Sequence, residues 1–450
     1  MSLKLTSYKG TRDLYPVDMA ERRYIFDGWR VIATRYGYKE YMAPLLEPVE
    51  IYAAKSGAEI VNEQTYSFTD RGGRQMVIRP EMTPSITRMV AARRQEMSMP
   101  ARLYSIANFM RYERPQHGRE REFWQLNLDV FGIDNIYAEL EIINMSWDVL
   151  GYFGATADMF TIRVNDRRLT DFIMRDYLGL NDDQTMCMIK LLDRYDKMPR
   201  GTFDAAASEI LNGDSALIDK LNNVISVKTL DELPAEIRDN EVTAPLRDLL
   251  GKLQAQGMTN VTYSVRLMRG FDYYTGIVFE VFDEAPENRR AMFGGGRYDG
   301  LVGLFGVEPL PVVGVAPGET TFREFLLAHN LMPDFSDSCG PNITVLPLGS
   351  TDTMDAATDI ADSLRGAGLN VTVDYTGRKA DKQTKAAVKN KAGWLIYVGD
   401  DELTDETMTV KNVSTGHQDK VPAVELISYF YAKLDEQLDS ALMKEVSEEE

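Results

Sequence analysis

Residues 101–132 read ARLYSIANFMRYERPQHGREREFWQLNLDVFG. Two runs of apolar and aromatic residues flank a polar loop around Gly118, which predicts two long strands joined by a loop. In the second run the residues alternate in character, and successive residues of a strand point to opposite faces. One face is therefore predicted to carry Phe123, Gln125, Asn127 and Asp129, and the other Trp124, Leu126, Leu128 and Val130.

The polar face of this strand has two interpretations. The simpler one is a half-exposed strand whose polar side faces water. Against it, four arginines lie in or beside the connecting loop: Arg111, Arg114, Arg119 and Arg121. Guanidinium groups bind carboxylates and phosphates in a fixed geometry. The combination therefore favours a site for an anion and a small polar ligand.

Two further segments interrupt apolar runs with polar residues. In LMRGFDYYTGIVFEVF (267–282), Arg269, Tyr273 and Tyr274 stand in a strand-like run, and buried polar groups need partners or a ligand. A tyrosine-rich edge strand is the alternative. In VIRPEMTPS (77–85), Glu81 is followed by Thr83. The glycine run at 294–296 permits close backbone approach, although such runs usually mark a turn, and FGGGRYDG is predicted to be a loop.

Composition excludes several classes of protein. The 450 residues include 50 basic and 69 acidic side chains, a net charge of −19, with 44% hydrophobic residues. This mix indicates a globular protein and argues against a polybasic nucleic-acid binder, though not against a local basic surface. The sequence shows no apolar run long enough for a membrane span and no signal-peptide core, so we expect a cytoplasmic protein without membrane partners. Two distant cysteines and three scattered histidines predict no metal site built from His or Cys.

Four segments follow along the chain. Residues 1–164 and 258–331 are predicted to form two parts of one β-rich core, and 165–257 a helical insertion between them. Residues 340–435 alternate strand and helix, which predicts a small, mostly parallel α/β domain. An opening helix capped by Asp18 and stopped by Gly37 runs into the strand-like YKEYMAPLLEP (38–48). These two elements suit a partner surface or, alternatively, a helix that covers a sheet.

Common nucleotide and nucleophile motifs are missing from the sequence. It contains no GxxxxGK[ST] phosphate loop, no GxGxxG between a strand and a helix, and no GxSxG. If the protein binds ATP, it therefore does so on a sheet with arginines.

Several segments together resemble the histidyl-tRNA synthetase family: KGTRDLYP (9–16), TYSFTDRGGRQMVIRPEMTPS (65–85), residues 110–132, residues 267–280 and FGGGRYDGLVGLFG (293–306). The resemblance extends from about residue 8 to 432. It implies an α+β fold with a class II antiparallel sheet core flanked by helices, a helical insertion, and a C-terminal α/β anticodon-binding domain at 340–435. It also implies a homodimer formed through the first helix and the strand at Pro44.

The resemblance further implies that histidine is activated with ATP and Mg²⁺ and transferred to the 3′ end of tRNA(His). Arg111 is expected to bridge the α-phosphate and the histidine carboxylate, and Arg269 to stabilise the α-phosphate during attack. Arg119 and Arg121 are expected to hold the outer phosphates. The α-amino group is assigned to Glu81, Thr83 and Gln125. The imidazole nitrogens are assigned to Asp129 and Tyr274, with Tyr273 alongside.

The sequence departs from the family pattern at one motif. Thr321 occupies the position where the third class II motif carries an ATP-binding arginine. Arg323 is a candidate substitute, and a plain helix arginine is the alternative. The departure raises a rival function, that of a non-charging paralogue such as the regulatory subunit of ATP phosphoribosyltransferase. That paralogue typically lacks the RGFDYYTG segment and the C-terminal domain.

The C-terminal segment carries a basic strip that the acidic total conceals. In TGRKADKQTKAAVKNK (376–391), basic residues recur at helical spacing and predict a phosphate-binding face. A solvated helix is the alternative. The residues proposed to bind tRNA are Arg378, Lys382, Lys385 and Lys389.

Overall fold

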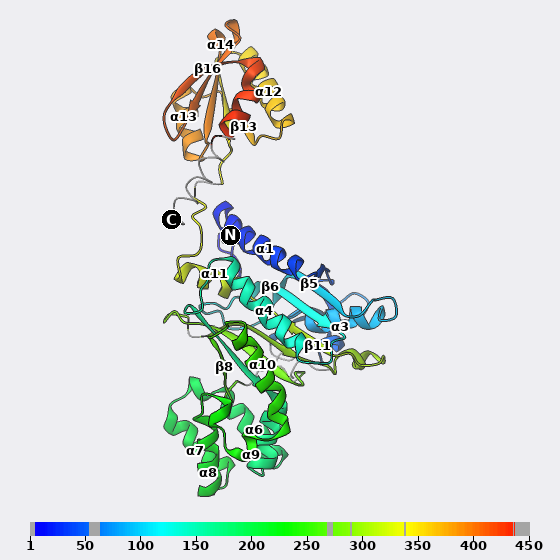
Figure 1. Ribbon diagram of the computed structural model, residues 1–450. Coiled ribbons are helices and arrows are strands. Elements are labelled where there is room, and N and C mark those ends of the chain that lie inside the picture. Colours follow the sequence, from blue (N-terminus) through cyan, green and yellow to red (C-terminus); the bar gives the residue numbers. More distant parts are fainter. Residues whose placement is uncertain are drawn as a thin grey trace. The chain divides into compact units, whose positions relative to one another are not determined.

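The computed structural model describes residues 5–53, 64–267, 273–288, 290–336, 339–434 and 436. The chain divides into two compact units, Met1–Pro333 and Asp334–Glu450 (Figure 1). Within the described residues, none of the helices is both long and apolar enough to cross a membrane. The finer division into four segments stays a prediction.

An eight-stranded sheet forms the centre of the first unit. Its order is β1-β5-β6-β11-β10-β9-β7-β8, and only the β1/β5 and β7/β8 pairs are parallel. The two long strands predicted from residues 101–132 are β5 and β6, paired antiparallel along their whole length. The strands are β1 (Lys39–Glu40), β5 (Ala101–Met110), β6 (Glu122–Phe131), β7 (Phe160–Asp166), β8 (Val261–Tyr263), β9 (Ile277–Asp283), β10 (Ala291–Arg297) and β11 (Val312–Val315).

Helices cover one face of this sheet. They are α1 (Pro16–Arg35), α4 (Tyr137–Tyr152) and α11 (Glu319–Ala328). Ile25 and Trp29 of α1 share one apolar cluster with Leu126 and Leu128 of β6, so the apolar side of β6 faces the helices as the alternation predicts. The polar side of β6 therefore faces the opposite way, toward the site described below.

The first helix begins earlier than predicted. Its N-cap is Tyr15, Pro16 is the first helical residue, and Asp18 accepts a hydrogen bond from the Tyr15 N–H (2.9 Å). Asp18 is thus the third helical residue and not the cap. The helix can start at Pro16 because the first turn needs no N–H for a helical hydrogen bond. The predicted stop is confirmed, since Gly37 follows the C-cap with a φ of 76°.

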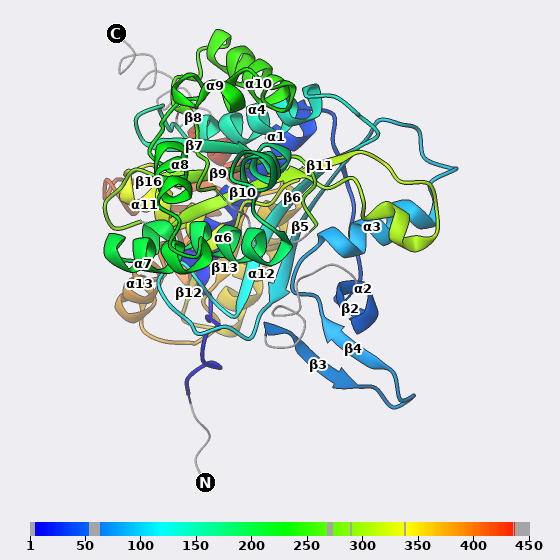
Figure 2. The same ribbon diagram turned by 90° about the horizontal axis from the view of Figure 1, so that it is seen from below.

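The segment after α1 is not one strand. It divides into β1 and β2 (Leu46–Pro48), which join different sheets. Pro44 lies between them, and proline has no N–H to continue a ladder. A second, three-stranded sheet of order β2-β4-β3 lies to one side with α2 (Figure 2). It contains a hairpin of β3 (Tyr66–Thr69) and β4 (Gln75–Ile78), and α2 spans Val49–Ala53.

Helices dominate the chain between β7 and β8, as the patterns there predict. The first turn of α6 shows why: Asn181 and Gln184 form a reciprocal capping box. The helices are α5 (Arg167–Phe172), α6 (Asp182–Asp193), α7 (Arg200–Ile210), α8 (Ser215–Ile225), α9 (Ala235–Arg238) and α10 (Ala244–Ala255). Shorter turns are η2 (Ile173–Tyr177), η3 (Tyr195–Lys197), η4 (Leu230–Glu232) and η5 (Glu241–Thr243).

The glycine run at 294–296 was expected in a loop, and this prediction is wrong. The three glycines lie inside β10, between β9 and β11. Gly295 allows the close approach of the next strand, since a Cβ there would be 2.1 Å from the carbonyl oxygen of Gly314. Glycine is present because two backbones need the room, and not because the chain turns.

The second unit is a five-stranded sheet of order β13-β12-β14-β15-β16. Two pairings are parallel and two antiparallel, so the sheet is mixed, and not mostly parallel as predicted. The hairpin at 407–422 and its pairing with β14 supply the antiparallel part. The strands are β12 (Ile343–Leu348), β13 (Val371–Val373), β14 (Trp394–Gly399), β15 (Thr407–Asn412) and β16 (Gln418–Pro422).

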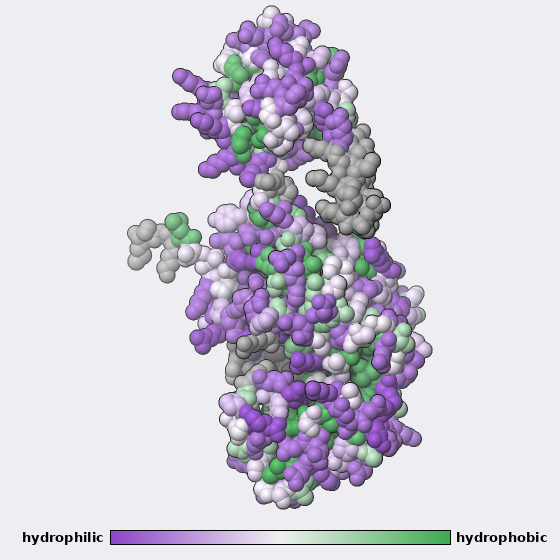
Figure 3. Space-filling view, turned by 60° about the vertical axis from the view of Figure 1, so that its left-hand side comes forward, coloured by the Kyte–Doolittle hydropathy of each residue, from purple (hydrophilic) through white to green (hydrophobic). Residues whose placement is uncertain are grey.

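Helices accompany this mixed sheet (Figure 1). They are α12 (Thr351–Gly366), α13 (Ala380–Lys389), α14 (Asp400–Thr404), the turn η7 (Ala423–Glu425) and residues 426–434. On the face shown in Figure 3, hydrophilic side chains predominate over this unit.

Candidate active site

The floor of the site is the polar face of β6. Asn127 lies opposite Ser105 of β5, and Gln125 lies opposite Ala107. Asn127 and Asp129 are each only 5% exposed. A solvated strand face would leave these groups in water. Their burial therefore favours the interpretation of this face as a ligand site.

Asp129 is held by Tyr298, which follows β10. The Tyr298 hydroxyl donates a short hydrogen bond to the Asp129 carboxylate. Gly314 of β11 lies opposite Asp129 in the sheet, and a Cβ there would be 2.2 Å from Asp129 Oδ1. A glycine at 314 thus leaves room for the carboxylate.

Burial raises the pKa of Asp129 to about 7, although the hydrogen bond from Tyr298 acts in the opposite direction. The pKa of Tyr298 is raised well above its usual value by burial and by the nearby carboxylate. A carboxyl group that titrates near neutrality, beside a hydroxyl that keeps its proton, is typical of a functional site.

This pKa predicts a pH dependence of stability. The unfolded carboxyl titrates near 3.8, so the folded protein binds more protons than the unfolded chain between about pH 4 and 7. The contribution of Asp129 to the free energy of unfolding therefore falls as pH rises through this window, by roughly 4 kcal/mol. We therefore expect the melting temperature of Asp129→Asn, relative to that of the wild type, to rise as the pH is raised from 4.5 to 7.5. Parallel curves would contradict the raised pKa.

Three tyrosines connect Asp129 to Glu81. The ring centroid of Tyr273 lies 4.9 Å from that of Tyr274 and 5.6 Å from that of Tyr298. The Tyr273 hydroxyl donates to Glu81 Oε2 (3.0 Å), and Glu81 is 4% exposed. All three tyrosines are buried, so they form an aromatic wall between two buried carboxylates.

Thr83 and Arg111 lie next to Glu81. Thr83 is the first residue of α3 (Thr83–Ala92), two positions after Glu81. Arg111 follows β5, and its Nε donates to the carbonyl oxygen of Pro80 (2.9 Å). The guanidinium lies over the ring of Phe123, 5.3 Å from its centroid. The structure thus places a cation beside the polar face of β6 and the Glu81 segment.

The loop between β5 and β6 presents two further arginines. Arg119 forms an ion pair with Glu113 (2.8 Å) and is half exposed. Arg121 donates from Nε to the carbonyl oxygen of Glu113 (3.0 Å) and from Nη1 to the hydroxyl of Tyr8 (2.7 Å). Arg121 directly precedes β6, and the Arg111 N–H donates to its carbonyl oxygen (2.8 Å), so Arg121 lies beside Arg111.

Position 321 does not supply a cation. The Thr321 hydroxyl donates to the carbonyl oxygens of Met292 (2.7 Å) and Gly318 (3.1 Å). Arg323, the candidate substitute, pairs instead with Glu21 of α1 (2.6 Å). This pairing supports the interpretation of Arg323 as a helix arginine that ties α11 to α1.

Two groups of predicted residues are described apart from this site. Arg269 lies outside the described residues. Lys382, Lys385 and Lys389 are exposed on α13 of the second unit, while Gln383 on the same helix is buried. Arg378 precedes that helix and pairs with Asp374 (2.9 Å).

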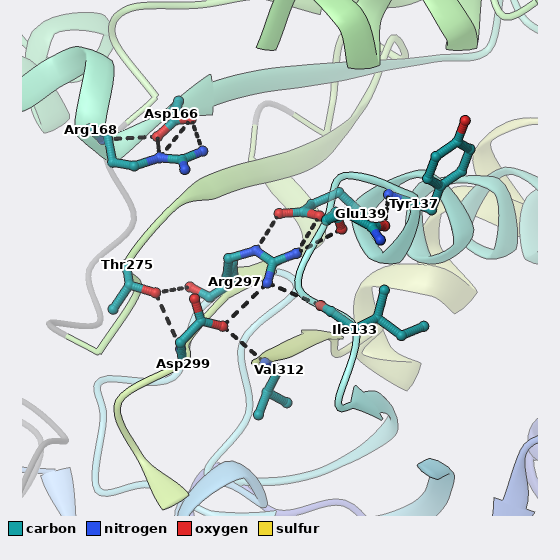
Figure 4. A network of polar contacts seen from close by, with 10 residues as sticks. Ile133, Tyr137, Glu139, Asp166, Arg168, Thr275, Arg297, Asp299 and Val312 are labelled. Atoms are coloured by element: carbon teal, nitrogen blue, oxygen red, sulfur yellow. Dashed lines mark hydrogen bonds and ion pairs between the residues drawn. The ribbon is translucent and has the colours of Figure 1, made fainter. Parts of the chain in front are cut away.

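Sequence reasoning missed Tyr298 as a functional residue. The only signal was its place after the glycine run, in GGGRYDG. Its neighbour Arg297 has a structural role, since it forms two hydrogen bonds to Glu139 (2.6 and 2.7 Å) and others to the carbonyl oxygens of Ile133 and Asn135 (Figure 4). This buried pair fixes the end of β10 and so helps to place Tyr298.

Within the described part of the chain, no group of three or more His, Cys, Asp or Glu is arranged to hold a metal ion. The buried carboxylates Glu81 and Asp129 are each engaged by a tyrosine. They suit a ligand with N–H donors better than a metal ion.

The fold is that of a class II aminoacyl-tRNA synthetase: a largely antiparallel sheet covered by helices on one face, and a separate α/β unit. A sequence model of the family described as "Histidyl-tRNA synthetase" matches residues 10–317, and one described as "Anticodon binding domain" matches residues 342–433. The chain belongs to the histidyl-tRNA synthetase family.

Individual relatives agree with this assignment. The chain is 38% identical over 420 residues to a histidine–tRNA ligase of Leptospira biflexa, covering 92% of this chain and 95% of the relative. It is 38% identical over 417 residues to that of Halobacterium salinarum, with the same coverage of both. The crystal structure of histidyl-tRNA synthetase from Nostoc sp. PCC 7120 shares the fold, with a TM-score of 0.77 at 20% identity, covering 96% of this chain and all of the other.

Proposed function

We propose that this protein is a histidine–tRNA ligase. It activates histidine with ATP to histidyl-adenylate and transfers the histidyl group to the 3′ end of tRNA(His). The observation that carries the proposal is the buried Asp129–Tyr298 pair at the end of the polar row on β6. A buried carboxylate acceptor in an aromatic pocket suits an imidazole N–H. Family membership and the similarity to histidine–tRNA ligases support the same function.

Histidine recognition follows from the positions of the carboxylates. Asp129 accepts a hydrogen bond from one imidazole nitrogen, and Tyr274 contacts the other. Glu81, Thr83 and Gln125 bind the α-amino group at the other end of the aromatic wall, where Tyr273 keeps Glu81 in place. A ligand that leaves these buried groups unpaired is rejected strongly, which gives the site its specificity.

Activation joins two anions. A carboxylate oxygen of histidine forms a bond to the α-phosphorus of ATP, and the bond from that phosphorus to the pyrophosphate leaving group breaks. Arg111 neutralises the α-phosphate and the histidine carboxylate together, assisted by Arg269. Arg119 and Arg121 hold the outer phosphates. The protein therefore works by charge stabilisation and alignment, without a nucleophile of its own.

Magnesium supplies charge neutralisation on the phosphates when it is bound. Since the described residues provide no cluster of three ligands, we expect the ion to be held largely by ATP and water, as Mg²⁺ commonly is.

Transfer also requires the protein to bind the tRNA. We propose that the exposed face of α13, with Lys382, Lys385, Lys389 and the preceding Arg378, contacts phosphates near the anticodon. These lysines lie at i, i+3 and i+7 and are exposed together, which suits a single nucleic-acid strand.

Replacing Lys382, Lys385 and Lys389 together by glutamine is expected to raise KM for tRNA about tenfold and to flatten its dependence on salt concentration. Histidine-dependent ATP–pyrophosphate exchange uses no tRNA and serves as the internal control, which should not change. Aminoacylation measured across a series of salt concentrations checks this. An unchanged KM for tRNA would indicate that α13 is a solvated helix and does not contact the tRNA.

We further propose a homodimer in the cytoplasm. α1 itself buries its apolar side on the sheet, so the partner surface is expected in the segment after it. Met42, Leu45 and Leu46 are 54%, 43% and 43% exposed in the stretch from the edge strand β1 to the edge strand β2. A cluster of exposed apolar side chains at a sheet edge is typical of a subunit contact.

Charging of tRNA(His) with labelled histidine tests the proposed function directly. The expected result is histidine attached to the tRNA in the presence of ATP. Absence of both charging and histidine-dependent exchange would favour the non-charging regulatory alternative.

A further inference from the structure

The N-terminal segment 7–12 lies on the loop that carries the phosphate-binding arginines. The Arg121 N–H donates to the carbonyl oxygen of Gly10 (2.6 Å), and Arg121 Nη1 donates to the hydroxyl of Tyr8 (2.7 Å). The mechanism above gives this segment, part of the KGTRDLYP stretch, no role.

The first set of contacts fixes the guanidinium of Arg121. It lies over the ring of Tyr112, 4.3 Å from the centroid, and over that of Tyr8, at 5.3 Å. With the bonds to Tyr8 and to the carbonyl oxygen of Glu113, the side chain is held between two rings and two acceptors. A side chain held in this way loses less conformational freedom when it binds a phosphate.

Gly10 allows the segment to lie this close. Its φ is +86°, a conformation that glycine adopts easily. A Cβ at this position would be 2.8 Å from both Arg121 Cγ and Pro115 Cγ. The segment thus packs directly against both sides of the loop.

A second set of contacts ties the loop to α11. Arg12 is 3.3 Å from the carboxylate of Glu120 and 3.5 Å from that of Glu319, which is buried. The Thr320 hydroxyl donates to the same Glu120 carboxylate (3.2 Å). Arg12 therefore bridges the loop and the first turn of α11, next to the position where Thr321 replaces the arginine.

We propose that segment 7–12 is a strap that positions the arginine loop for ATP, with Tyr8, Gly10 and Arg12 as positioning residues. The inference rests on the proposed function, because it takes Arg121 to bind phosphate. Thr321 brings no cation, and the proposed function assigns the outer phosphates to Arg119 and Arg121 of the loop. The strap pre-organises those arginines and leaves the histidine pocket unaffected.

Steady-state exchange kinetics of Tyr8→Phe and Arg12→Met test the strap. Each is expected to raise KM for ATP about fivefold, the cost of one hydrogen bond or ion pair to a charged group at a half-exposed site, and to leave KM for histidine within about twofold. Arg12→Lys keeps the charge and should recover part of the loss. Tyr15→Phe is the matched control, since Tyr15 is 71% exposed in the same N-terminal stretch, and it should behave as wild type.

Amide hydrogen exchange of residues 111–121 provides a readout that does not need activity. It should be faster in Tyr8→Phe and Arg12→Met than in the wild type. If the wild-type protein shows no histidine-dependent ATP–pyrophosphate exchange, the proposed function is refuted. The amide hydrogen exchange of the variants would still test the strap. Equal rises in KM for ATP and histidine, or unchanged KM for ATP with unchanged hydrogen exchange, would overturn the strap.

Discussion

Asp129→Asn is expected to lower kcat/KM for histidine about 100-fold in ATP–pyrophosphate exchange, with KM for ATP within about twofold of wild type. The asparagine has nearly the same size but carries no charge. It also presents an NH₂ group where the imidazole N–H needs an acceptor. Since Asp129 is 5% exposed, water cannot replace the lost interaction.

Tyr298→Phe provides a graded comparison for this effect. It removes the hydroxyl that donates to Asp129 but keeps the ring in the aromatic wall. We expect a smaller loss in kcat/KM for histidine, of about tenfold, because the carboxylate remains with one partner fewer. Activity of Asp129→Asn within about threefold of wild type would refute the assignment of Asp129 to the imidazole.

Arg111→Ala is expected to lower kcat of exchange by about 100- to 1,000-fold, the usual cost of losing one preorganised donor at a developing charge. The guanidinium is held over Phe123 and against the carbonyl oxygen of Pro80, so it needs little reorganisation when the two anions meet. The loss should appear in kcat more than in KM for histidine, because the charge interaction is strongest in the transition state.

Arg323→Ala is the matched control for Arg111→Ala. Arg323 pairs with Glu21 on the helix-covered side of the sheet, so KM for ATP should stay within about twofold of wild type. A large rise in KM for ATP would make Arg323 the substitute for the missing arginine. A kcat of Arg111→Ala within about tenfold of wild type would remove Arg111 from the reaction.

Local sequence patterns predicted strands β5 and β6 and the two faces of β6. The alternation in 122–131 correctly separated the polar row from Leu126 and Leu128. One side of this strand packs against helices and the other carries the polar row, so apolar and polar residues alternate along it. Pairing between distant segments is not encoded in such local patterns. The contact of Tyr298 with Asp129 joins residues 169 positions apart, and it depends on β11 lying between β6 and β10.

The incorrect predictions also arise because local sequence patterns do not encode contacts with distant segments. The glycines at 294–296 suggested a loop from local preference, but the approach of the neighbouring strand decides their structure. Likewise, Asp18 is a residue type that often caps helices, but the cap is Tyr15 and the helix starts at Pro16, three residues earlier than predicted. The contacts of segment 7–12 could not be predicted from the sequence. Nothing near Tyr8 or Arg12 indicates that both contact a loop about 110 residues further along the chain.

We propose that the buried pocket at Asp129 selects histidine. Amino-acid-dependent ATP–pyrophosphate exchange tests it most directly, with histidine measured beside threonine, proline and glycine. We predict exchange with histidine at least about 1,000-fold above that with the other three, because only an imidazole pairs the buried groups at the end of the pocket. Exchange with another amino acid at a comparable rate, or none with histidine, would contradict the account.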